Sequence, residues 1–184
     1  NVANFHDLID FCIGYGGNYN PTRPDLRVGD LQTLETDALN VLADVIARRT
    51  TFNNVVNVRM DAFTGLKSLS TRLINALEAT QATDQLIKDA KTINKKIQGK
   101  RAGKIEKPTD PNTPVPETIS TSQQSYSQLI QHFSALIEVL QSEPTYAPNE
   151  TALQISTITA YRNDLTAKNN DVSLRYTEVS NSRI

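Results

Sequence analysis

The distribution of helix-breaking residues constrains this chain more than any other feature. Between residues 30 and 98 there is no proline and a single glycine, Gly65, and from residue 117 to residue 184 there is no glycine and only two prolines. Both residue types are costly in helix interiors, so two long stretches are free to be helical. Between these stretches, four of the eight prolines fall within nine residues, at Pro108, Pro111, Pro114 and Pro116. This clustering favours extended backbone and predicts a basic, proline-rich linker at 99–117.

Apolar residues recur at helical spacing through both stretches. One-sided patterns predict helices at about 64–79 and 83–98 and a further helix in the second stretch. The segment from Leu26 to Met60 is more broadly apolar, so it should pack against more than one neighbour; its apolar residues include Leu31, Leu34, Ala38, Leu42, Val45, Phe52, Val55 and Val56. Thr83-Asp84 and Asn149-Glu150 each place a capping residue and an acid at an expected helix start. The three one-sided stripes are Leu66, Leu69, Leu73, Ile74 and Leu77; Leu86, Ile87, Ala90, Ile93 and Ile97; and Leu129, Ile130, Phe133, Leu136, Ile137 and Leu140.

The chain also repeats itself. An offset of 127 places the Tyr146-Ala147-Pro148 segment beneath Tyr19-Asn20-Pro21, and an offset of 128 matches a short apolar helix upstream of each. The repeated unit is a short helix, a turn carrying Tyr-x-Pro, and a long helix. The second copy stops at Ile184, so the repeat is either incomplete or continued in a longer chain. Aligned pairs include Phe5/Phe133, Leu8/Leu136, Ile9/Ile137, Leu26/Leu153, Leu31/Ile158, Asp44/Asp171 and Arg48/Arg175.

These patterns predict an all-α protein, an elongated helical bundle of about six helices with a pseudo-symmetric internal repeat. We expect a first helical half at 1–98, the linker at 99–117, and a second helical half at 118–184. Strand signals are nearly absent, and roughly 70 apolar side chains are enough for a core.

A resemblance follows from the Tyr-x-Pro turn that leads into a long helix, from Leu73-Ile74-Asn75-Ala76-Leu77, and from the segment Ile93-Asn94-Lys95-Lys96-Ile97-Gln98-Gly99-Lys100-Arg101-Ala102. These segments look like parts of a group of uncharacterised bacterial helical proteins with an internal duplication. The resemblance implies a bacterial origin and a helical fold. It supplies no activity and no catalytic residues.

Candidate chemistry is sparse. The single cysteine, Cys12, lies on an apolar stripe and is expected to be a small core residue, and the two histidines, His6 and His132, lack metal-ligand spacing. The glycine-rich segment 14–19 does not match a phosphate-binding loop and is expected to form a tight turn with positive φ angles. We therefore expect no cofactor, no metal site and no enzyme activity. No apolar run is long enough to cross a bilayer, and the sequence gives no compartment.

One local charge anomaly stands out from a nearly neutral chain. Residues 88–107 carry a charge of +6, which leaves −7 for the remainder of a chain whose net charge is −1. Three interpretations stay open: lysines that complement a helix dipole, a surface for an acidic protein partner such as another copy, and a nucleic-acid site. The candidate partner-binding residues are Lys88, Lys91, Lys95, Lys96, Lys100, Arg101 and Lys104.

The sequence thus predicts a non-enzymatic structural or protein-interaction module that binds a protein partner or associates with itself. A nucleic-acid-binding protein that uses segment 88–107 is the alternative. No small-molecule substrate is evident. A helical membrane-acting toxin fits less well, because its apolar tongue would have to be the proline-rich basic linker.

Overall fold

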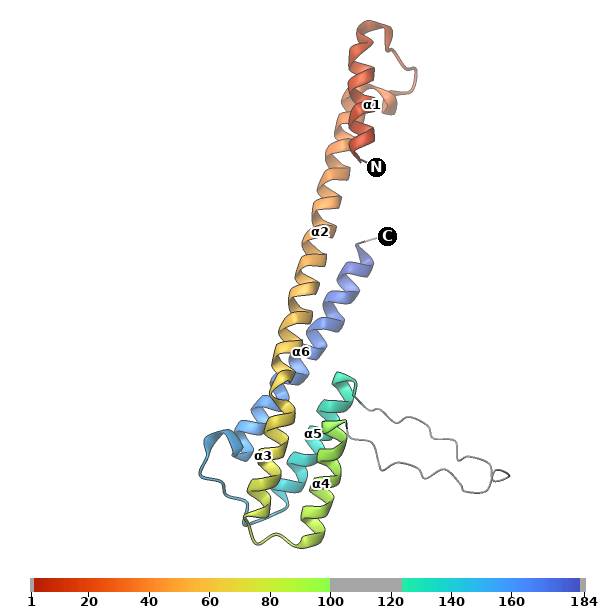
Figure 1. The fold of residues 1–184 in the computed structure, drawn as a ribbon. Helices are drawn as coiled ribbons and strands as arrows, with labels where there is room; N and C mark the ends of the chain where they lie inside the picture. Colours follow the sequence, from red (N-terminus) through yellow and green to blue (C-terminus); the bar gives the residue numbers. More distant parts are fainter. Residues whose placement is uncertain (1, 100–123, 183–184) are drawn as a thin grey trace, which may run out of the picture. The chain divides into compact units, whose positions relative to one another are not determined.

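The structure of the chain is a computed structural model that describes residues 2–99 and 124–182 (Figure 1). Every regular element within these ranges is helical, which confirms the all-α prediction for this part of the chain. Of the predicted linker 99–117, only Gly99 is described. The helices are α1 (Val2–Gly14), α2 (Val28–Thr64), α3 (Leu66–Glu78), α4 (Asp84–Gln98), α5 (Tyr126–Gln141) and α6 (Ile155–Asn181), with 3₁₀ turns at η1 (Gly16–Asn18), η2 (Pro24–Leu26) and η3 (Thr151–Leu153).

The chain divides into two compact units. Unit 1 comprises residues 1–54 and 174–184, and unit 2 comprises residues 55–173. These units are not the two predicted sequence halves, because each contains residues from both halves. The predicted halves describe a relationship in sequence, and that relationship stays a prediction.

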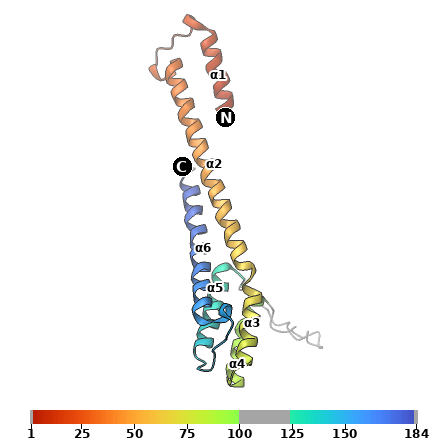
Figure 2. The ribbon, with the colours of Figure 1, turned by 90° about the vertical axis from the view of Figure 1, so that its left-hand side faces the viewer.

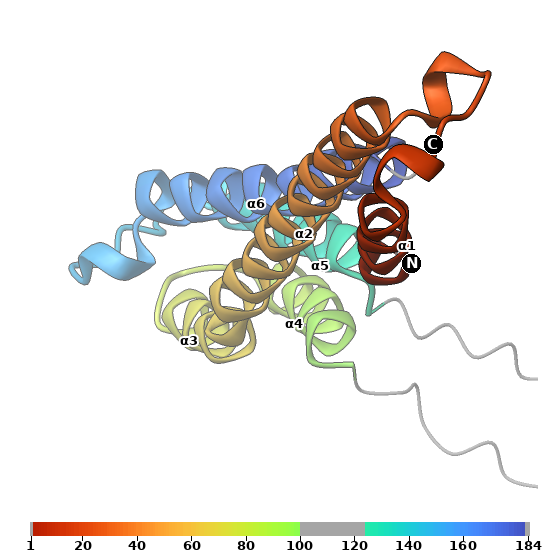
Figure 3. The ribbon, with the colours of Figure 1, turned by 90° about the horizontal axis from the view of Figure 1, so that it is seen from above.

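Unit 2 holds the larger core, formed where α4 packs against α3 on one side and α5 on the other (Figures 1 and 3). The predicted stripes supply most of it, so these expectations are confirmed. Two pairs of aromatic rings also pack edge to face in this core, Phe63 with Tyr126 and Phe133 with Tyr161. The most deeply buried side chains are Leu66, Leu73, Leu77, Ala90, Ile97, Phe133, Leu136, Leu140, Ile158 and Leu165.

The boundaries of α3 and α4 follow from local chemistry. Gly65 interrupts the helical run between α2 and α3, and Thr83 caps α4 by accepting a hydrogen bond from the Leu86 N–H at 3.3 Å. At the other end of α4, Gly99 adopts the left-handed conformation, with φ of 70°. The helices predicted at 64–79 and 83–98 are thus confirmed to within two residues.

The start of α6 differs from the prediction. Asn149-Glu150 precedes a 3₁₀ turn, η3, and the α-helix begins only at Ile155, after Gln154 has taken an extended backbone with ψ of 143°. Glu150 instead forms an ion pair with Arg72 on α3. The cap prediction was wrong because capping residues also occur at the start of a single 3₁₀ turn, where sequence alone does not separate the two.

In unit 1, α1 lies alongside the first turns of α2 (Figure 2). Ile9, Cys12 and Leu31 form a small buried cluster, which confirms Cys12 as a core residue. His6 contacts Glu35 of α2, with Nδ1 2.7 Å from the carboxylate oxygen. The turn after α1 contains Gly16 with φ of 54°, as expected for this glycine-rich segment.

Candidate functional site

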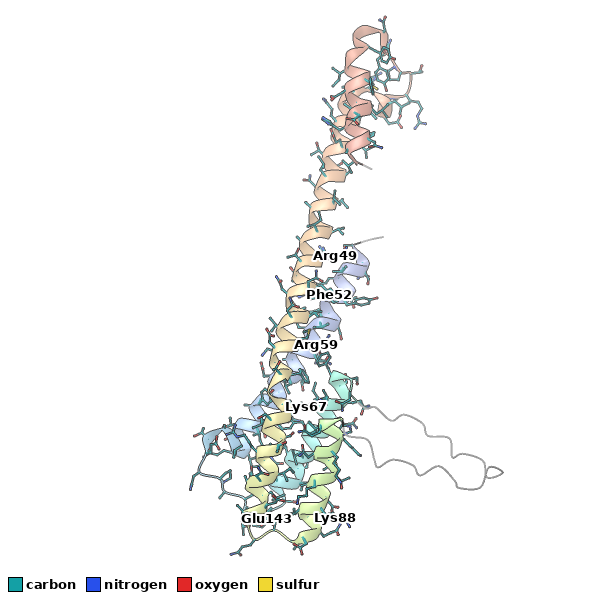
Figure 4. All side chains as sticks on the ribbon, viewed as in Figure 1. Arg49, Phe52, Arg59, Lys67, Lys88 and Glu143 are labelled. Carbon is teal, nitrogen blue, oxygen red and sulfur yellow. The ribbon has the colours of Figure 1, made fainter. Side chains whose placement is uncertain are left out.

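The lysines predicted to bind a partner lie on the exposed side of α4. Lys88, Lys91, Lys95 and Lys96 are all exposed, and Figure 4 labels Lys88 near the start of this helix. The first three are spaced at i, i+3 and i+7, so they share one helical face, which we call the lysine face. Lys91 forms an ion pair with Glu78 at the end of α3. The other three candidates, Lys100, Arg101 and Lys104, lie outside the described residues.

The C-terminal end of α4 is held by amide contacts. The Gly99 N–H donates to the Lys96 carbonyl at 3.2 Å, the Gln124 side chain donates to the same carbonyl at 2.6 Å, and the Gln98 side chain donates to the Lys67 carbonyl at 2.7 Å. A charge in the last turn complements the helix dipole, but this effect fades within one turn. It therefore accounts for Lys95 and Lys96, and it does not account for Lys88 or Lys91.

His132 lies on α5, on the buried side that faces α4. Its side chain is buried, and its Nε2 has no hydrogen-bond partner among the described residues. Burial and the nearby charge of Lys96 lower the pKa of His132 below its usual 6.5. The imidazole is therefore a neutral core residue at pH 7, in an environment that disfavours its charged form.

The most unusual surface of the described chain belongs to unit 1. On α1 and directly after it, Leu8, Phe11 and Tyr15 are 51%, 69% and 66% exposed, and their spacing of i, i+3 and i+7 places them on one face. We call these three residues the α1 stripe. It lies beside the buried stripe of Ile9 and Cys12, so one short helix carries two apolar stripes.

Helix α2 continues this exposure. Leu34 and Leu42 belong to the segment expected to pack against more than one neighbour, but they are 55% and 46% exposed, so that expectation was wrong at these positions. Periodicity identifies an apolar face but carries no information about whether a partner helix covers it. Five further large apolar side chains of this helix are also exposed: Leu39, Val41, Ile46, Val58 and Met60.

The same surface is acidic. Helix α1 carries Asp7 and Asp10 and no lysine or arginine, and α2 between Val28 and Ala47 carries four carboxylates and no lysine or arginine. A shallow depression on α1 is lined by Asp7, Asp10 and Phe11. Two carboxylates beside an aromatic ring form a favourable environment for a lysine or arginine side chain. The carboxylates of α2 in this region are Asp30, Glu35, Asp37 and Asp44.

The two Tyr-x-Pro turns have the same internal hydrogen bond. The Tyr19 hydroxyl donates to the Leu26 carbonyl at 2.7 Å, and the Tyr146 hydroxyl donates to the Leu153 carbonyl at 3.0 Å. Tyr146 is buried, and burial raises its pKa to about 12. Each tyrosine therefore ties the entry of a long helix to the preceding turn, which is a structural role.

Two half-buried arginines line the α2, α5 and α6 surfaces within unit 2. The Arg59 guanidinium lies over the Tyr126 ring at 4.1 Å from its centroid and donates to Asn169 at 3.3 Å (Figure 4). Arg162 donates to the Ser134 hydroxyl at 3.3 Å. These contacts join helices by packing and by hydrogen bonds from charged guanidinium groups to uncharged acceptors.

An open apolar pocket in unit 2 is lined by residues around the α2–α3 junction and the first turns of α6. Its two polar side chains are Thr157 and Tyr161, and the Tyr161 hydroxyl already donates to the Ala62 carbonyl at 2.6 Å. The pocket therefore offers apolar contact and little acid–base chemistry. Its lining residues are Ala62, Gly65, Leu69, Ala152, Thr157, Ile158 and Tyr161.

Metal binding and membrane crossing require features of other kinds. Within residues 2–99 and 124–182, no group of three or more His, Cys, Asp and Glu side chains is placed to hold a metal ion. None of the helices described combines the length and the hydropathy that crossing a membrane requires.

The lysine face was predicted from sequence, whereas the α1 stripe was missed. The sequence contains a signal for the α1 stripe: Leu8, Phe11 and Tyr15 recur at i, i+3 and i+7, and Leu8 and Phe11 each directly precede a residue of the buried stripe, Ile9 or Cys12. No family model, no curated protein and no solved structure matches this chain.

Proposed function

We propose that this chain is a non-enzymatic structural or protein-interaction module that binds other proteins through helical faces. The observation that carries the proposal is the concentration of exposed large apolar side chains on α1 and α2. Monomeric proteins rarely expose extensive apolar surface, and surfaces of this kind are typical of protein-binding sites. The lysine face of α4 is the second proposed contact surface, with the candidate cations of segment 88–107.

We also infer that the chain contains an internal repeat. The two 3₁₀ turns, η2 and η3, are offset by 127 residues, as are the starts of α2 and α6. The hydrogen bonds made by Tyr19 and Tyr146 span seven residues in both turns. This agreement in turn type, helix start and hydrogen bond supports a duplicated unit. The resemblance to bacterial helical proteins with an internal duplication is consistent with it and stays a prediction.

Exposure of the aligned residues gives the repeat a functional meaning. Leu136 on α5 is fully buried by its neighbours, whereas its counterpart Leu8 on α1 is 51% exposed. Leu153 is 7% exposed and its counterpart Leu26 is 42% exposed. The same unit is therefore covered in one copy and uncovered in the other, which supports the proposal that a further protein surface covers the first copy.

Photo-crosslinking tests this function directly. A photoreactive phenylalanine analogue replaces Phe11 in the full chain, and a matched variant carries the analogue at Asn163, an exposed helical position on α6. Irradiation in an extract of the natural source should give protein adducts at position 11 and few at position 163. If neither position yields a protein adduct, the interaction role is wrong.

The exposed lysines favour nucleic-acid binding as a second candidate function. Neutralising phosphates with lysines makes binding strongly salt-dependent. The test compares the full chain with a variant in which Lys95, Lys96, Lys100 and Arg101 are all changed to Gln. Nucleic-acid binding predicts that DNA affinity falls with salt and is lost in the variant. Equal DNA affinity before and after the change excludes this candidate.

A further inference from the structure

We propose that the acidic, apolar surface of α1 and α2 in one copy of this chain binds the lysine face of α4 in a second copy. The inference rests on the proposed interaction function and adds the identity of the partner. The contact involves one surface from each copy. The first is the α1 stripe with its flanking carboxylates, and the second is the lysine face formed by Lys88, Lys91 and Lys95.

The two surfaces match in charge. Helix α1 and the first half of α2 together carry six carboxylates. Arg48 pairs with Asp44, and His6 pairs with Glu35 and Asp10, which leaves Asp7, Asp30 and Asp37 without an ion pair among the described residues. Helix α4 carries four lysines against two aspartates. Opposite charges across an interface steer association and disfavour other pairings. A basic helix is therefore the occupant that the acidic surface selects, and α4 is the helix of this chain with the most exposed cations among the described residues.

The surfaces also match in chemistry at the level of side chains. Lysine has a long aliphatic stem that covers apolar surface while its ammonium group stays near water or a carboxylate. Lys88, Lys91 and Lys95 repeat at i, i+3 and i+7, the spacing of Leu8, Phe11 and Tyr15 on the α1 stripe. One lysine head group fits the depression lined by Asp7, Asp10 and Phe11. The stems then cover the α1 stripe.

Pairing of two α1–α2 surfaces with each other is less favourable. Such a symmetric contact would bring six carboxylates of one copy close to six of the other, and only two basic side chains of the described chain pair with them: Arg48 with Asp44, and His6 with Glu35 and Asp10. Like charges across an interface are costly. The charge pattern therefore favours a contact between unlike surfaces.

A contact between unlike surfaces has a definite consequence for assembly. Each copy keeps one free acidic surface and one free lysine face, so association continues beyond a dimer unless a ring closes. Removal of either surface should stop growth. Mixing a copy that lacks one surface with a copy that lacks the other should restore one contact and give a dimer.

The experiment measures the molar mass of the full chain by sedimentation velocity from about 1 to about 200 μM, a range that covers weak, micromolar contacts. Wild-type protein should form species larger than a dimer as concentration rises, and 1 M salt should weaken them. Phe11→Asp and the double variant Lys88→Glu/Lys95→Glu should each weaken association about tenfold or more. An equimolar mixture of the two variants should form a heterodimer and nothing larger.

Control variants make matched changes elsewhere. Leu174→Asp introduces the same charge at an exposed apolar position of α6, and Lys67→Glu/Arg72→Glu reverses two exposed cations of α3. Both controls should associate like wild type. Since Phe11, Lys88 and Lys95 are all exposed, their variants should keep the wild-type far-UV circular dichroism, which separates lost association from lost folding.

Three results would overturn the inference: a wild-type chain that stays monomeric throughout, a Lys88→Glu/Lys95→Glu variant that associates like wild type, and a variant mixture without heterodimer. A monomeric chain whose position 11 still crosslinks to another protein would refute only self-association. A monomeric chain without crosslinks would refute the interaction function as well.

Discussion

Leu8 and Leu136 provide a matched test of the uncovered surface, because they are the same residue type at aligned positions of two helices. Leu136→Ala removes a side chain that is 0% exposed, so it should leave a cavity and lower the free energy of unfolding by about 2–5 kcal/mol. Leu8 is 51% exposed. Full burial of a leucine side chain contributes about 1.5–3 kcal/mol, and a half-exposed one leaves no closed cavity, so Leu8→Ala should cost about 1 kcal/mol or less. Helix propensity cancels in the comparison.

The assay is urea denaturation followed by far-UV circular dichroism, with each variant at about 1 μM to keep weak association low. Because the two positions belong to different units, amide hydrogen exchange on α1 and α5 should report each loss separately. Refutation is simple to recognise. If Leu8→Ala lowers the free energy of unfolding as much as Leu136→Ala, then Leu8 is buried in solution and the first copy is not uncovered.

Three further predictions concern single positions in unit 2. Gly99→Ala should destabilise the chain by about 1 kcal/mol, because Gly99 has a φ of +70° and a Cβ there would lie 2.9 Å from the Gln124 side chain. Gly65→Ala should stabilise the chain by about 0.4–1 kcal/mol, because Gly65 has a φ of −80° and open space around it. Urea denaturation measures both changes, and the opposite order would contradict the assigned conformations. Tyr146→Phe should cost about 1 kcal/mol by the same assay, because it removes the buried hydrogen bond to the Leu153 carbonyl, and no loss would contradict that bond. The pKa of His132 is lowered in the folded state, so the unfolded chain takes up a proton first as the pH falls. The free energy of unfolding should therefore fall as the pH drops below about 6.5, with no effect of this group above it. His132→Leu should remove this part of the pH dependence, and an unchanged profile would contradict the burial of a neutral imidazole.

The elements with one-sided apolar patterns were predictable from sequence. For α4, the stripe and the cap at Thr83 indicate the same boundaries, and for α3 the stripe alone placed the start within two residues of Leu66. Burial of Leu73, Leu77 and Ile97 followed from the same pattern. The late start of α6 was not predictable, because Asn149-Glu150 is as compatible with a 3₁₀ turn as with an α-helix.

The candidate site was predictable only in part, and for a physical reason. The lysine face is a feature of local sequence, since its charges and their helical spacing are read directly from residues 88–96. The exposure of Leu8, Phe11 and Leu34 depends on which helices pack against α1 and α2, and that is a tertiary property. An apolar stripe reads the same in a sequence whether a helix covers it or water does.

The two proposed copies differ in the helices that pack against them. The described chain has two short helices that align in the proposed repeat, α1 and α5, and the aligned leucines Leu8 and Leu136 are exposed and buried respectively. It has one further helix pair, α3 and α4, and the inward side of α4 already packs against α5. The outward side of α4 in a second copy is basic and exposed, whereas the surface around α1 is acidic. The outward side of α4 is therefore the surface on which the interaction proposal depends most.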